Sequence, residues 1–300
     1  MGVVLITGCS TGFGRQAAEA LALGGHRVFA TMRNVDGKNR EAADALRNAP
    51  VADGGKIEVL DLDVTSEASV AATAAQTRAL GTVPDVVVNN AGQMYVGLTE
   101  AFTAEELSRQ LDVNIVGIHR VLRAFLPDMR KRGSGLVINL SSVAGRFAAP
   151  FFGVYHASKW AVEGYSLALR RELACTGVDV VVVEPGPFST ELFPQSPSPQ
   201  DADERAATYP PVARQTFDEM GAAFEGMFLD PEVPTDPKMV VDRIVELIDM
   251  APGTREFRSA VGFDVGVTAR NASDEAHDPA FLEMMGLTEF VKLRTGEAGK

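Results

Sequence analysis

The sequence predicts a doubly wound α/β fold, in which helices cover both faces of a parallel sheet. Short apolar runs alternate with Ala- and Leu-rich stretches of helical character along most of the chain, a rhythm typical of βαβ units. The run Val178–Val183 is almost entirely valine, which suits a strand buried on both faces. The chain has 300 residues, of which 46% are hydrophobic and 23% charged, as expected for one large globular domain.

The apolar runs predict six strands, and a seventh is expected after them. The strands lie near residues 3–6, 27–31, 57–60, 85–89, 136–140, 178–183 and 257–261. Thr103 and Glu106 form a capping box that opens a long helix, which we expect to run until Pro127. A later helix is indicated by apolar residues at helical spacing, at Val240, Ile244 and Ile248.

The strands and helices indicate a single domain over residues 1–262. Within it, prolines punctuate the polar stretch 187–232, which we expect to be a mobile or partly helical flap. The tail, residues 263–300, is polar and weakly patterned, and the sequence assigns it no role.

Charge and cysteine content exclude several classes of partner. The formal charge of −12 repels phosphate backbones and anionic membrane surfaces, so we expect neither nucleic acid nor a membrane as a partner. Cys9 and Cys175 lie far apart and lack metal-ligand spacing, so we expect both to be buried and no metal site. Met1 leads into the first strand without a targeting signal, and we expect a cytoplasmic protein.

A glycine-rich turn follows the first strand and opens a helix-like segment. Such a turn presents backbone N–H groups and the positive end of a helix to a pyrophosphate, although it can also form a tight turn without a ligand. The spacing, G-x-x-x-G-x-G, differs from the common G-x-G-x-x-G dinucleotide fingerprint. The residues expected to bind the cofactor here are Gly8, Ser10, Thr11, Gly12, Phe13 and Gly14.

The end of the second strand indicates which dinucleotide is bound. An acid at this point accepts hydrogen bonds from the ribose 2′-hydroxyl of NAD, but the position holds Met32, followed by Arg33. The guanidinium fork of arginine matches a phosphate, so NADP(H) is favoured. A solvated arginine at the strand end is the ordinary alternative, and Asp36 nearby keeps NAD(H) open.

Two polar residues of the candidate catalytic set stand out from their spacing. Tyr155 and Lys159 lie four residues apart, on one face of a predicted helix. A free tyrosine has a pKa near 10, and a neighbouring ammonium lowers that value by favouring the phenolate.

Together these motifs resemble those of the short-chain dehydrogenase/reductase family, over roughly the first 190 residues. The glycine turn resembles the TGxxxGxG pattern of this family, Asn89–Gly92 its NNAG motif, and Tyr155 with Lys159 its YxxxK pair. The glycine turn and the second strand resemble those of 17β-hydroxysteroid and retinol dehydrogenase-like members. The resemblance implies a Rossmann fold.

The resemblance also implies a role for each residue of the catalytic set. Tyr155 exchanges a proton with the substrate oxygen, which Ser142 holds, and Lys159 binds the nicotinamide ribose hydroxyls. Asn114, in the long helix, holds a water that links Lys159 to solvent.

Further cofactor contacts follow from the same resemblance. The adenine is expected beside Asp63 and Val64, after the third strand. The floor beneath the adenosine is expected at Asn89, Ala91 and Gly92, and Asn90 is also expected to bind the cofactor. The nicotinamide is expected beside Pro185, Gly186, Phe188 and Thr190.

These residues predict an NADP(H)-dependent oxidoreductase that interconverts a carbonyl and a secondary or primary alcohol. An apolar pocket lining favours a bulky apolar substrate, although such side chains can also seal the flap against the core. The lining consists of Met94, Tyr95, Phe147, Phe151, Phe152, Phe188 and Phe193.

Several alternative functions share parts of this pattern. They are an NAD(H)-dependent enzyme, and a non-catalytic NADP(H)-binding sensor, which the full catalytic set argues against. The glycine spacing disfavours an epimerase or dehydratase of the extended relatives, and His156 lacks the G-x-S-x-G elbow of a hydrolase. In the family, the helices near 103–126 and 154–174 pair with their copies, so a homo-oligomer, either a dimer or a tetramer, is expected.

Overall fold

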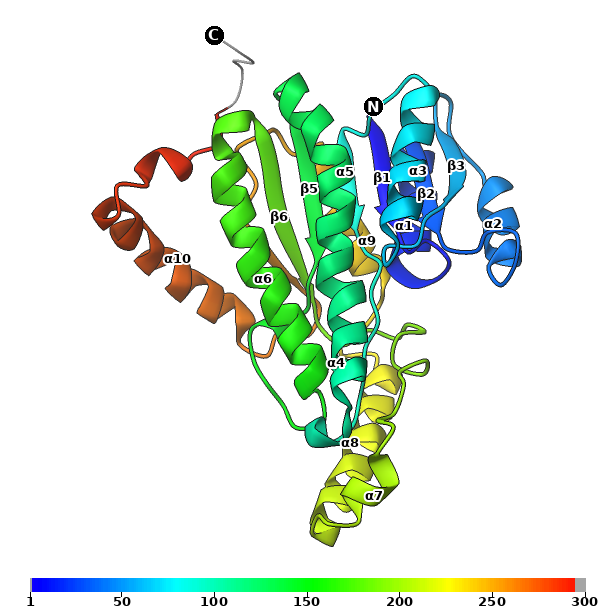
Figure 1. The fold of residues 1–300 in the computed structure, drawn as a ribbon, viewed down its shortest axis with the longest axis vertical. Coiled ribbons are helices and arrows are strands. Elements are labelled where there is room, and N and C mark those ends of the chain that lie inside the picture. The colour runs from blue at the N-terminus through cyan, green and yellow to red at the C-terminus, as the bar shows by residue number, and fades with distance from the viewer. Residues whose placement is uncertain (1, 295–300) are drawn as a thin grey trace.

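The computed structural model describes residues 2–294 and contains a seven-stranded sheet in the order β3-β2-β1-β4-β5-β6-β7 (Figure 1). All neighbouring strands are parallel. The strands are β1 (Val3–Thr7), β2 (Arg27–Met32), β3 (Lys56–Asp61), β4 (Val86–Asn89), β5 (Gly135–Leu140), β6 (Val178–Pro185) and β7 (Arg258–Val261). The doubly wound fold and the seven expected strands are therefore confirmed.

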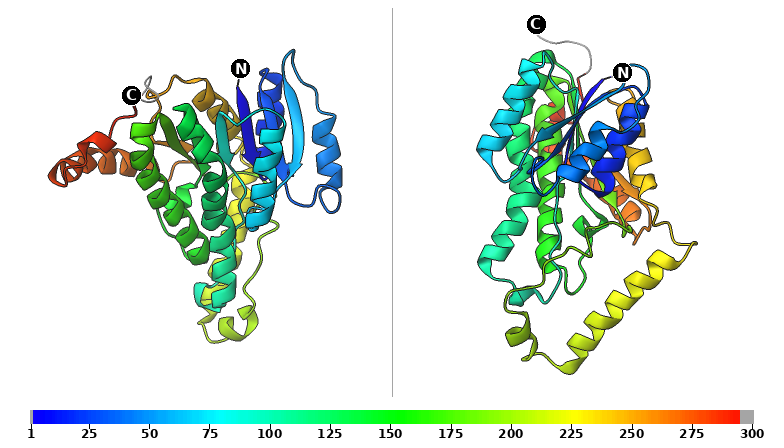
Figure 2. Two further views of the ribbon diagram at one scale, coloured as in Figure 1. Left: turned by 45° about the horizontal axis from the view of Figure 1, so that its top comes forward. Right: turned by 90° about the vertical axis from the view of Figure 1, so that its right-hand side faces the viewer.

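Helices cover both faces of the sheet and enclose two apolar cores (Figures 1 and 2). One core packs α1 (Gly12–Leu23), α2 (Arg40–Arg47) and α9 (Lys238–Asp249) on one face of the sheet. The other core packs α3 (Glu67–Ala79), α5 (Gly117–Arg132) and α6 (Gly153–Leu173) on the opposite face. Every residue of β6 is buried, as its valine-rich sequence predicts.

The helix that begins at the capping box differs from its prediction in two ways. The box is present: Thr103 Oγ1 accepts from the N–H of Glu106, and the Glu106 carboxylate accepts from the N–H of Thr103. However, α4 (Ala104–Leu111) passes through a π-helical turn, η2 (Asp112–Val116), into α5. The expected end at Pro127 is wrong, because the buried Phe125 and Met129 hold the helix against the sheet until Gly133, whose φ of 72° ends it.

The flap and the tail both contain helices. The flap holds α7 (Ala202–Ala206) and α8 (Pro211–Leu229), and α8 has no fully buried residue. The helix α8 crosses below the carboxyl ends of the strands as a separate arm, shown in yellow in Figure 2. The tail, weakly patterned in sequence, forms α10 (Val267–Met284) beside β7. Residues 295–300 of the predicted tail lie outside the described residues.

The expectation that both cysteines are buried is half wrong. Cys9 is buried, and burial raises the pKa of its thiol to about 12. Cys175 is exposed, because it lies in the short turn η4 (Ala174–Thr176) after α6, where the chain leaves the core. Within residues 2–294, no helix is long and apolar enough to cross a membrane, and no three His, Cys, Asp or Glu side chains are grouped to bind a metal.

Candidate active site

The glycine turn and the Asn89–Gly92 segment meet where the strand order reverses, between β1 and β4. Thr7 Oγ1 accepts from the backbone N–H groups of Asn90 and Ala91, both at 3.0 Å. The Asn90 side chain in turn donates to the carbonyls of Thr7 and Gly8, at 2.8 and 3.1 Å. In open α/β sheets, ligands bind at such a reversal, beyond the carboxyl ends of the strands. The Asn90 amide therefore fixes the shape of the turn at this point.

Two glycines of the turn serve different purposes: Gly12 leaves space for a ligand, and Gly14 allows the backbone to pack closely. Gly12 has a φ of 58° and open space where a side chain would lie. At Gly14, a Cβ atom would come within 2.6 Å of Gly8 O, so the turn packs tightly behind that space. The first turn of α1 has neither a side-chain cap nor an acidic residue. Its free N–H groups and positive end suit the pyrophosphate of a dinucleotide.

The end of β2 offers a cation to the adenosine side of this site. Met32 is buried, whereas Arg33 is exposed and forms no ion pair within residues 2–294. The nearest acid of the sheet edge, Asp61, accepts from the N–H groups of Asn34 and Val35 and is thereby engaged by the backbone. A free guanidinium is available here for a phosphate.

The segment after β3 lies at the same edge of the sheet. One Asp63 oxygen accepts from both the N–H and the hydroxyl of Thr65, at 2.9 and 2.7 Å. The carbonyl of Val64 accepts from Arg120 at 3.1 Å, and Val64 packs against Gly117. Both residues are therefore held in place by neighbouring side chains.

Ser142, Tyr155 and Lys159 are buried together beyond the end of β5. Ser142 Oγ accepts from Ala144 N at 3.1 Å, at the start of the turn η3 (Val143–Gly145), and donates to Pro185 O at 3.2 Å. Lys159 Nζ donates to Leu140 O at 2.8 Å and lies 5.7 Å from the centre of the Tyr155 ring.

Burial shifts the charge state of both titratable members of this set. It raises the pKa of Tyr155 to about 12, although a hydrogen bond with the Ser142 hydroxyl lowers that pKa. Burial also lowers the pKa of Lys159 to about 8, although the negative charge of Glu163 raises that pKa. Near neutral pH, the site thus combines a protonated phenol with an ammonium group that loses its proton unusually readily.

Asn114 lies in the π-helical turn η2, close to the same residues. Its oxygen accepts from Gln93 N, and its amide donates to Gln93 O and to Ser158 Oγ, all within 2.9 to 3.0 Å. Ser158 Oγ donates to Tyr155 O at 2.7 Å, which links this turn to the start of α6. π-Helical turns occur often at functional sites.

The segment after β6 completes the edge of the site. Gly186 N donates to Val261 O at 2.9 Å, and a Cβ at Gly186 would lie 2.7 Å from Phe263 O. Phe188 packs edge-on against Phe13 of the glycine turn, with ring centres 5.6 Å apart. Thr190 is half-buried and accepts only a long bond from Leu192 N within its own loop.

A family model for short-chain dehydrogenases matches residues 2–201. The chain belongs to the short-chain dehydrogenase family. This match covers the glycine turn, the strand ends and the Ser142, Tyr155 and Lys159 set.

Relatives of this short-chain dehydrogenase bear several names. A 3-ketodihydrosphingosine reductase from Bacteroides thetaiotaomicron is 39% identical over 63% of the chain and 64% of the relative. A human 17-beta-hydroxysteroid dehydrogenase type 1 is 43% identical over 64% of the chain and 58% of the relative. Both matches thus span less than two thirds of the relative. An estradiol 17-beta-dehydrogenase 1 from Rattus norvegicus is 34% identical over 99% of the chain and 84% of the relative.

The solved structures agree with this family. A crystal structure of a short-chain dehydrogenase from Streptomyces avermitilis superimposes with a TM-score of 0.75 and is 31% identical. The superposition covers 95% of this chain and 98% of that one.

An apolar cluster surrounds Tyr155 in this short-chain dehydrogenase. Of the seven residues predicted to line the substrate pocket, Met94, Phe152 and Phe193 pack in this cluster, together with Met220 and Phe224 of α8. The other four lie in different contacts: Tyr95 on Phe102, Phe147 on His156, Phe151 on Phe217, and Phe188 on Phe13.

Two buried carboxylates behind the catalytic set were not predicted from the sequence. Glu163 accepts from Arg258 Nε at 2.9 Å, and Glu184 accepts from Asn271 Nδ2 at 2.5 Å. Burial, and then the charge of Glu163, raise the pKa of Glu184 to about 8. The sequence signals were a glutamate one helical turn after Lys159 and a glutamate at the end of a valine-rich strand.

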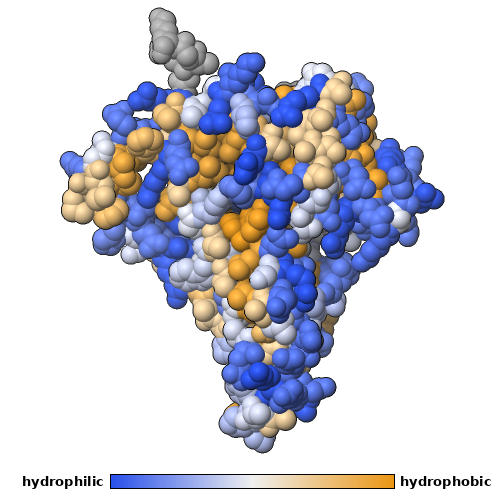
Figure 3. Space-filling view, viewed as in Figure 1, coloured by the Kyte–Doolittle hydropathy of each residue, from blue (hydrophilic) through white to orange (hydrophobic). Residues whose placement is uncertain are grey.

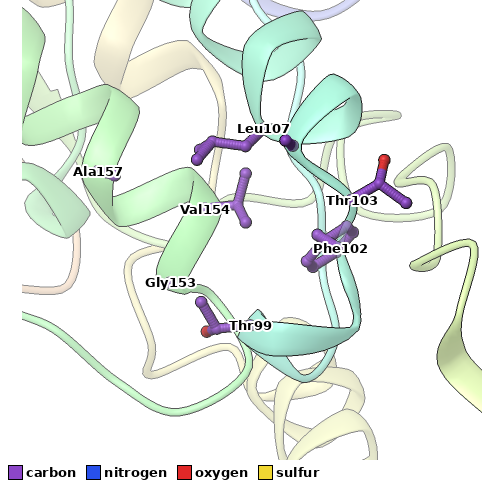
Figure 4. Close-up of a pocket in the computed structure, with 8 residues that line it drawn as sticks. Thr99, Phe102, Thr103, Leu107, Gly153, Val154 and Ala157 are labelled. Atoms are coloured by element: carbon purple, nitrogen blue, oxygen red, sulfur yellow. The ribbon is translucent and has the colours of Figure 1, made fainter. Parts of the chain in front are cut away.

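An apolar hollow of about 190 Å³ lies between α4 and α6, and Tyr155 is not among the residues that line it (Figure 4). It is lined by Thr99, Phe102, Thr103, Ala104, Leu107, Gly153, Val154 and Ala157. These side chains offer no titratable group, so the hollow is not a site of proton transfer.

Proposed function

We propose that this short-chain dehydrogenase interconverts a carbonyl and a secondary or primary alcohol with NADP(H). The observation that carries the proposal is the burial of Ser142, Tyr155 and Lys159 together, beside an uncapped helix start that suits a pyrophosphate. When bound, the nicotinamide supplies or accepts the hydride. The remaining chemistry, holding the oxygen and moving its proton, belongs to residues of the chain.

In the reductive direction, Tyr155 is the proton donor. Its raised pKa keeps the phenol protonated at neutral pH, as a general acid requires. Ser142 Oγ turns from Pro185 O towards the substrate oxygen and stabilises the negative charge that develops there. The ammonium of Lys159 stabilises the Tyr155 phenolate that remains after the proton has been donated. Asn114, in its π-helical turn, would hold the water that links Lys159 to solvent and through which a proton returns.

The proposed cofactor contacts are the residues at the carboxyl edge of the sheet. The helix start at Gly12–Gly14 takes the pyrophosphate, Asp63 and Val64 take the adenine, and Ala91 and Gly92 take the adenosine, with Asn90 as support. Pro185, Gly186, Phe188 and Thr190 would hold the nicotinamide, and Tyr155 and Lys159 would bind the ribose hydroxyls. Residues 1–262, flap included, form the catalytic domain in this proposal.

NADP(H) is preferred to NAD(H) in this proposal because of the unpaired Arg33. Some relatives point the same way: an NADPH-dependent pterin aldehyde reductase from Arabidopsis thaliana is 38% identical over 63% of the chain and 76% of the relative. A polyketide ketoreductase solved with NADPH is 28% identical, with a TM-score of 0.68.

The substrate we propose is a bulky apolar ketone or aldehyde. The cluster around Tyr155 is aliphatic and aromatic, and α8 adds Met220 and Phe224 to it. Such a lining suits an apolar body anchored by one polar oxygen. The names of two relatives, a 3-ketodihydrosphingosine reductase and a 17-beta-hydroxysteroid dehydrogenase, describe substrates of this kind.

The test is NADPH oxidation in the presence of 17-ketosteroids, long-chain 3-ketones and small charged ketones. We expect the wild type to turn over the bulky apolar compounds. In Tyr155→Phe, turnover should fall about a thousandfold, because the phenylalanine ring keeps the packing but has no proton to donate. Turnover that is confined to small charged ketones contradicts the proposed substrate, and turnover that survives in Tyr155→Phe contradicts the proposed mechanism.

A further inference from the structure

The C-terminal helix α10 makes a buried polar contact with two segments of the candidate active site. Asn271, in the first half of α10, is only 7% exposed. Its side-chain nitrogen donates to Glu184 Oε2 at 2.5 Å, and its oxygen accepts from Arg146 Nε at 2.9 Å. One side chain therefore bridges the end of β6 and the loop that follows β5.

These two segments also meet at Ser142. Its hydroxyl donates to the carbonyl of Pro185, the residue directly after Glu184. It accepts from Ala144 N in the turn η3, which leads into Arg146. A shift of either segment therefore moves a partner of the Ser142 hydroxyl.

Further contacts tie α10 to Arg146. The Arg146 guanidinium pairs with Asp274, and Arg270 donates to the backbone oxygen of Arg146 at 2.5 Å. Glu184 is fully buried and the Arg146 side chain is 10% exposed, so loss of Asn271 leaves a buried donor and a buried acceptor without their partner. Such a loss loosens the segments that carry these groups.

We propose that Asn271 is a positioning residue, which holds the Ser142 loop and the Glu184–Pro185 strand end in place from α10. The effect on turnover rests on the proposed function, whereas the effect on the loop does not. The family match ends at residue 201, so this role falls to a part of the chain outside the matched region. The tail thereby acquires a function that its weak sequence pattern does not indicate.

Hydrogen–deuterium exchange on the full chain tests the positional claim. We expect amides in peptides covering residues 141–146 to exchange about tenfold faster in Asn271→Ala than in the wild type, because two buried hydrogen bonds are lost. The matched control is Ser273→Ala, an exposed position on α10 whose side chain donates no hydrogen bond within residues 2–294. Exchange in 141–146 should be unchanged in this control.

Kinetics on the same variants separate positioning from a general loss of structure. With NADPH and a 17-ketosteroid, we expect kcat to fall about tenfold in Asn271→Ala while the Kd for NADPH stays within about twofold. Asn271→Asp keeps an acceptor for Arg146 but places a second carboxyl group against Glu184, so its kcat should fall at least as far as in Asn271→Ala.

Two results overturn the inference. One is exchange in 141–146 that matches the control, and the other is exchange that rises equally throughout the chain. If the wild type turns over no ketone, the proposed function fails, and the exchange experiment alone still decides whether α10 holds the loop.

Discussion

Lys159 and Tyr155 lie in surroundings that disfavour the charged form of each side chain. Burial lowers the pKa of Lys159 to about 8 and raises that of Tyr155 to about 12. Because an opposite charge nearby favours ionisation, the ammonium makes the phenolate accessible during turnover. The site thus keeps a proton donor ready at neutral pH without a free carboxylate.

The lowered pKa of Lys159 predicts a pH dependence of stability. Its pKa in the unfolded chain is near 10.4 and in the folded chain about 8, so between these values the unfolded chain binds more protons. The free energy of unfolding of the wild type, relative to Lys159→Met, should therefore rise by roughly 3 kcal/mol from pH 7 to above pH 10. Urea unfolding of both proteins at each pH measures this change, and a constant difference between them contradicts it.

Arg33 allows a direct test of cofactor choice. In Arg33→Asp, we expect NADPH to bind about a hundredfold more weakly, because the carboxylate repels the 2′-phosphate, while NADH binding changes only a few-fold. Fluorescence titration with each cofactor measures both values. The control is Arg130→Asp, the same charge change at an exposed position near the end of α5. Equal weakening for both cofactors would rule out Arg33 as the discriminating residue.

Some residues of the site could be predicted from the sequence and others could not. Ser142, Tyr155 and Lys159 have fixed spacings on neighbouring elements, so local pattern suffices to single them out. Glu184 and Asn271 come together only through the tertiary fold, 87 residues apart in the chain. No local pattern marks such a pair. The catalytic and cofactor roles themselves remain predictions.

At the scale of elements, α8 is the part of the flap that packs on the apolar cluster around Tyr155. It has no fully buried residue, yet Met220 and Phe224 pack on the cluster around Tyr155. The ring centre of Phe224 lies 6.1 Å from that of Phe152 and 5.6 Å from that of Phe193. A helix with so little burial should open at low free-energy cost, as the proposed substrate-covering role of the flap requires.

Removal of one α8 ring should change substrate affinity. In Phe224→Ala, we expect the KM for a bulky apolar ketone to rise about tenfold with kcat within about twofold, because the ring offers apolar contact but no chemistry. Phe217→Ala is the control, since Phe217 is on the same helix but packs on Phe151. Steady-state kinetics measure both variants, and an equal change in the two would remove Phe224 from the substrate wall.

The bounds of the elements show where local pattern fails. The capping box at Thr103 was predicted correctly because it depends on residues three apart. The π-helical turn and the passage through Pro127 depend on packing against the sheet, which outweighs the one hydrogen bond that a proline removes. The helix α10 lacks strong periodicity because few of its residues are buried.

At the scale of the whole molecule, the alternation of apolar runs and helical stretches was enough to predict the sheet. Strand periodicity and right-handed βαβ crossovers leave few arrangements open. No such rule places α8 below the carboxyl ends of the strands or α10 beside β7 (Figures 1 and 2). Here the structure added most to the sequence.

We also propose that the chain forms a dimer or tetramer through the α4–α6 face. Apolar surface appears over these helices in Figure 3, and Leu107, Val116 and Trp160 are 37%, 39% and 49% exposed. We expect Trp160→Glu to shift the molar mass in solution, measured by light scattering, towards the monomer, because a charge is costly in an apolar interface. The control is Leu229→Glu, on α8. A monomeric wild type contradicts the proposal.

Isotope transfer tests the central claim most directly. NADPH carrying deuterium at the transferable position of the nicotinamide is incubated with the enzyme and a 17-ketosteroid, and the alcohol product is analysed by mass spectrometry. The account predicts one deuterium on the new carbinol carbon with the wild type and almost no product with Tyr155→Phe. An alcohol without deuterium, or undiminished product from Tyr155→Phe, would contradict hydride transfer at this site.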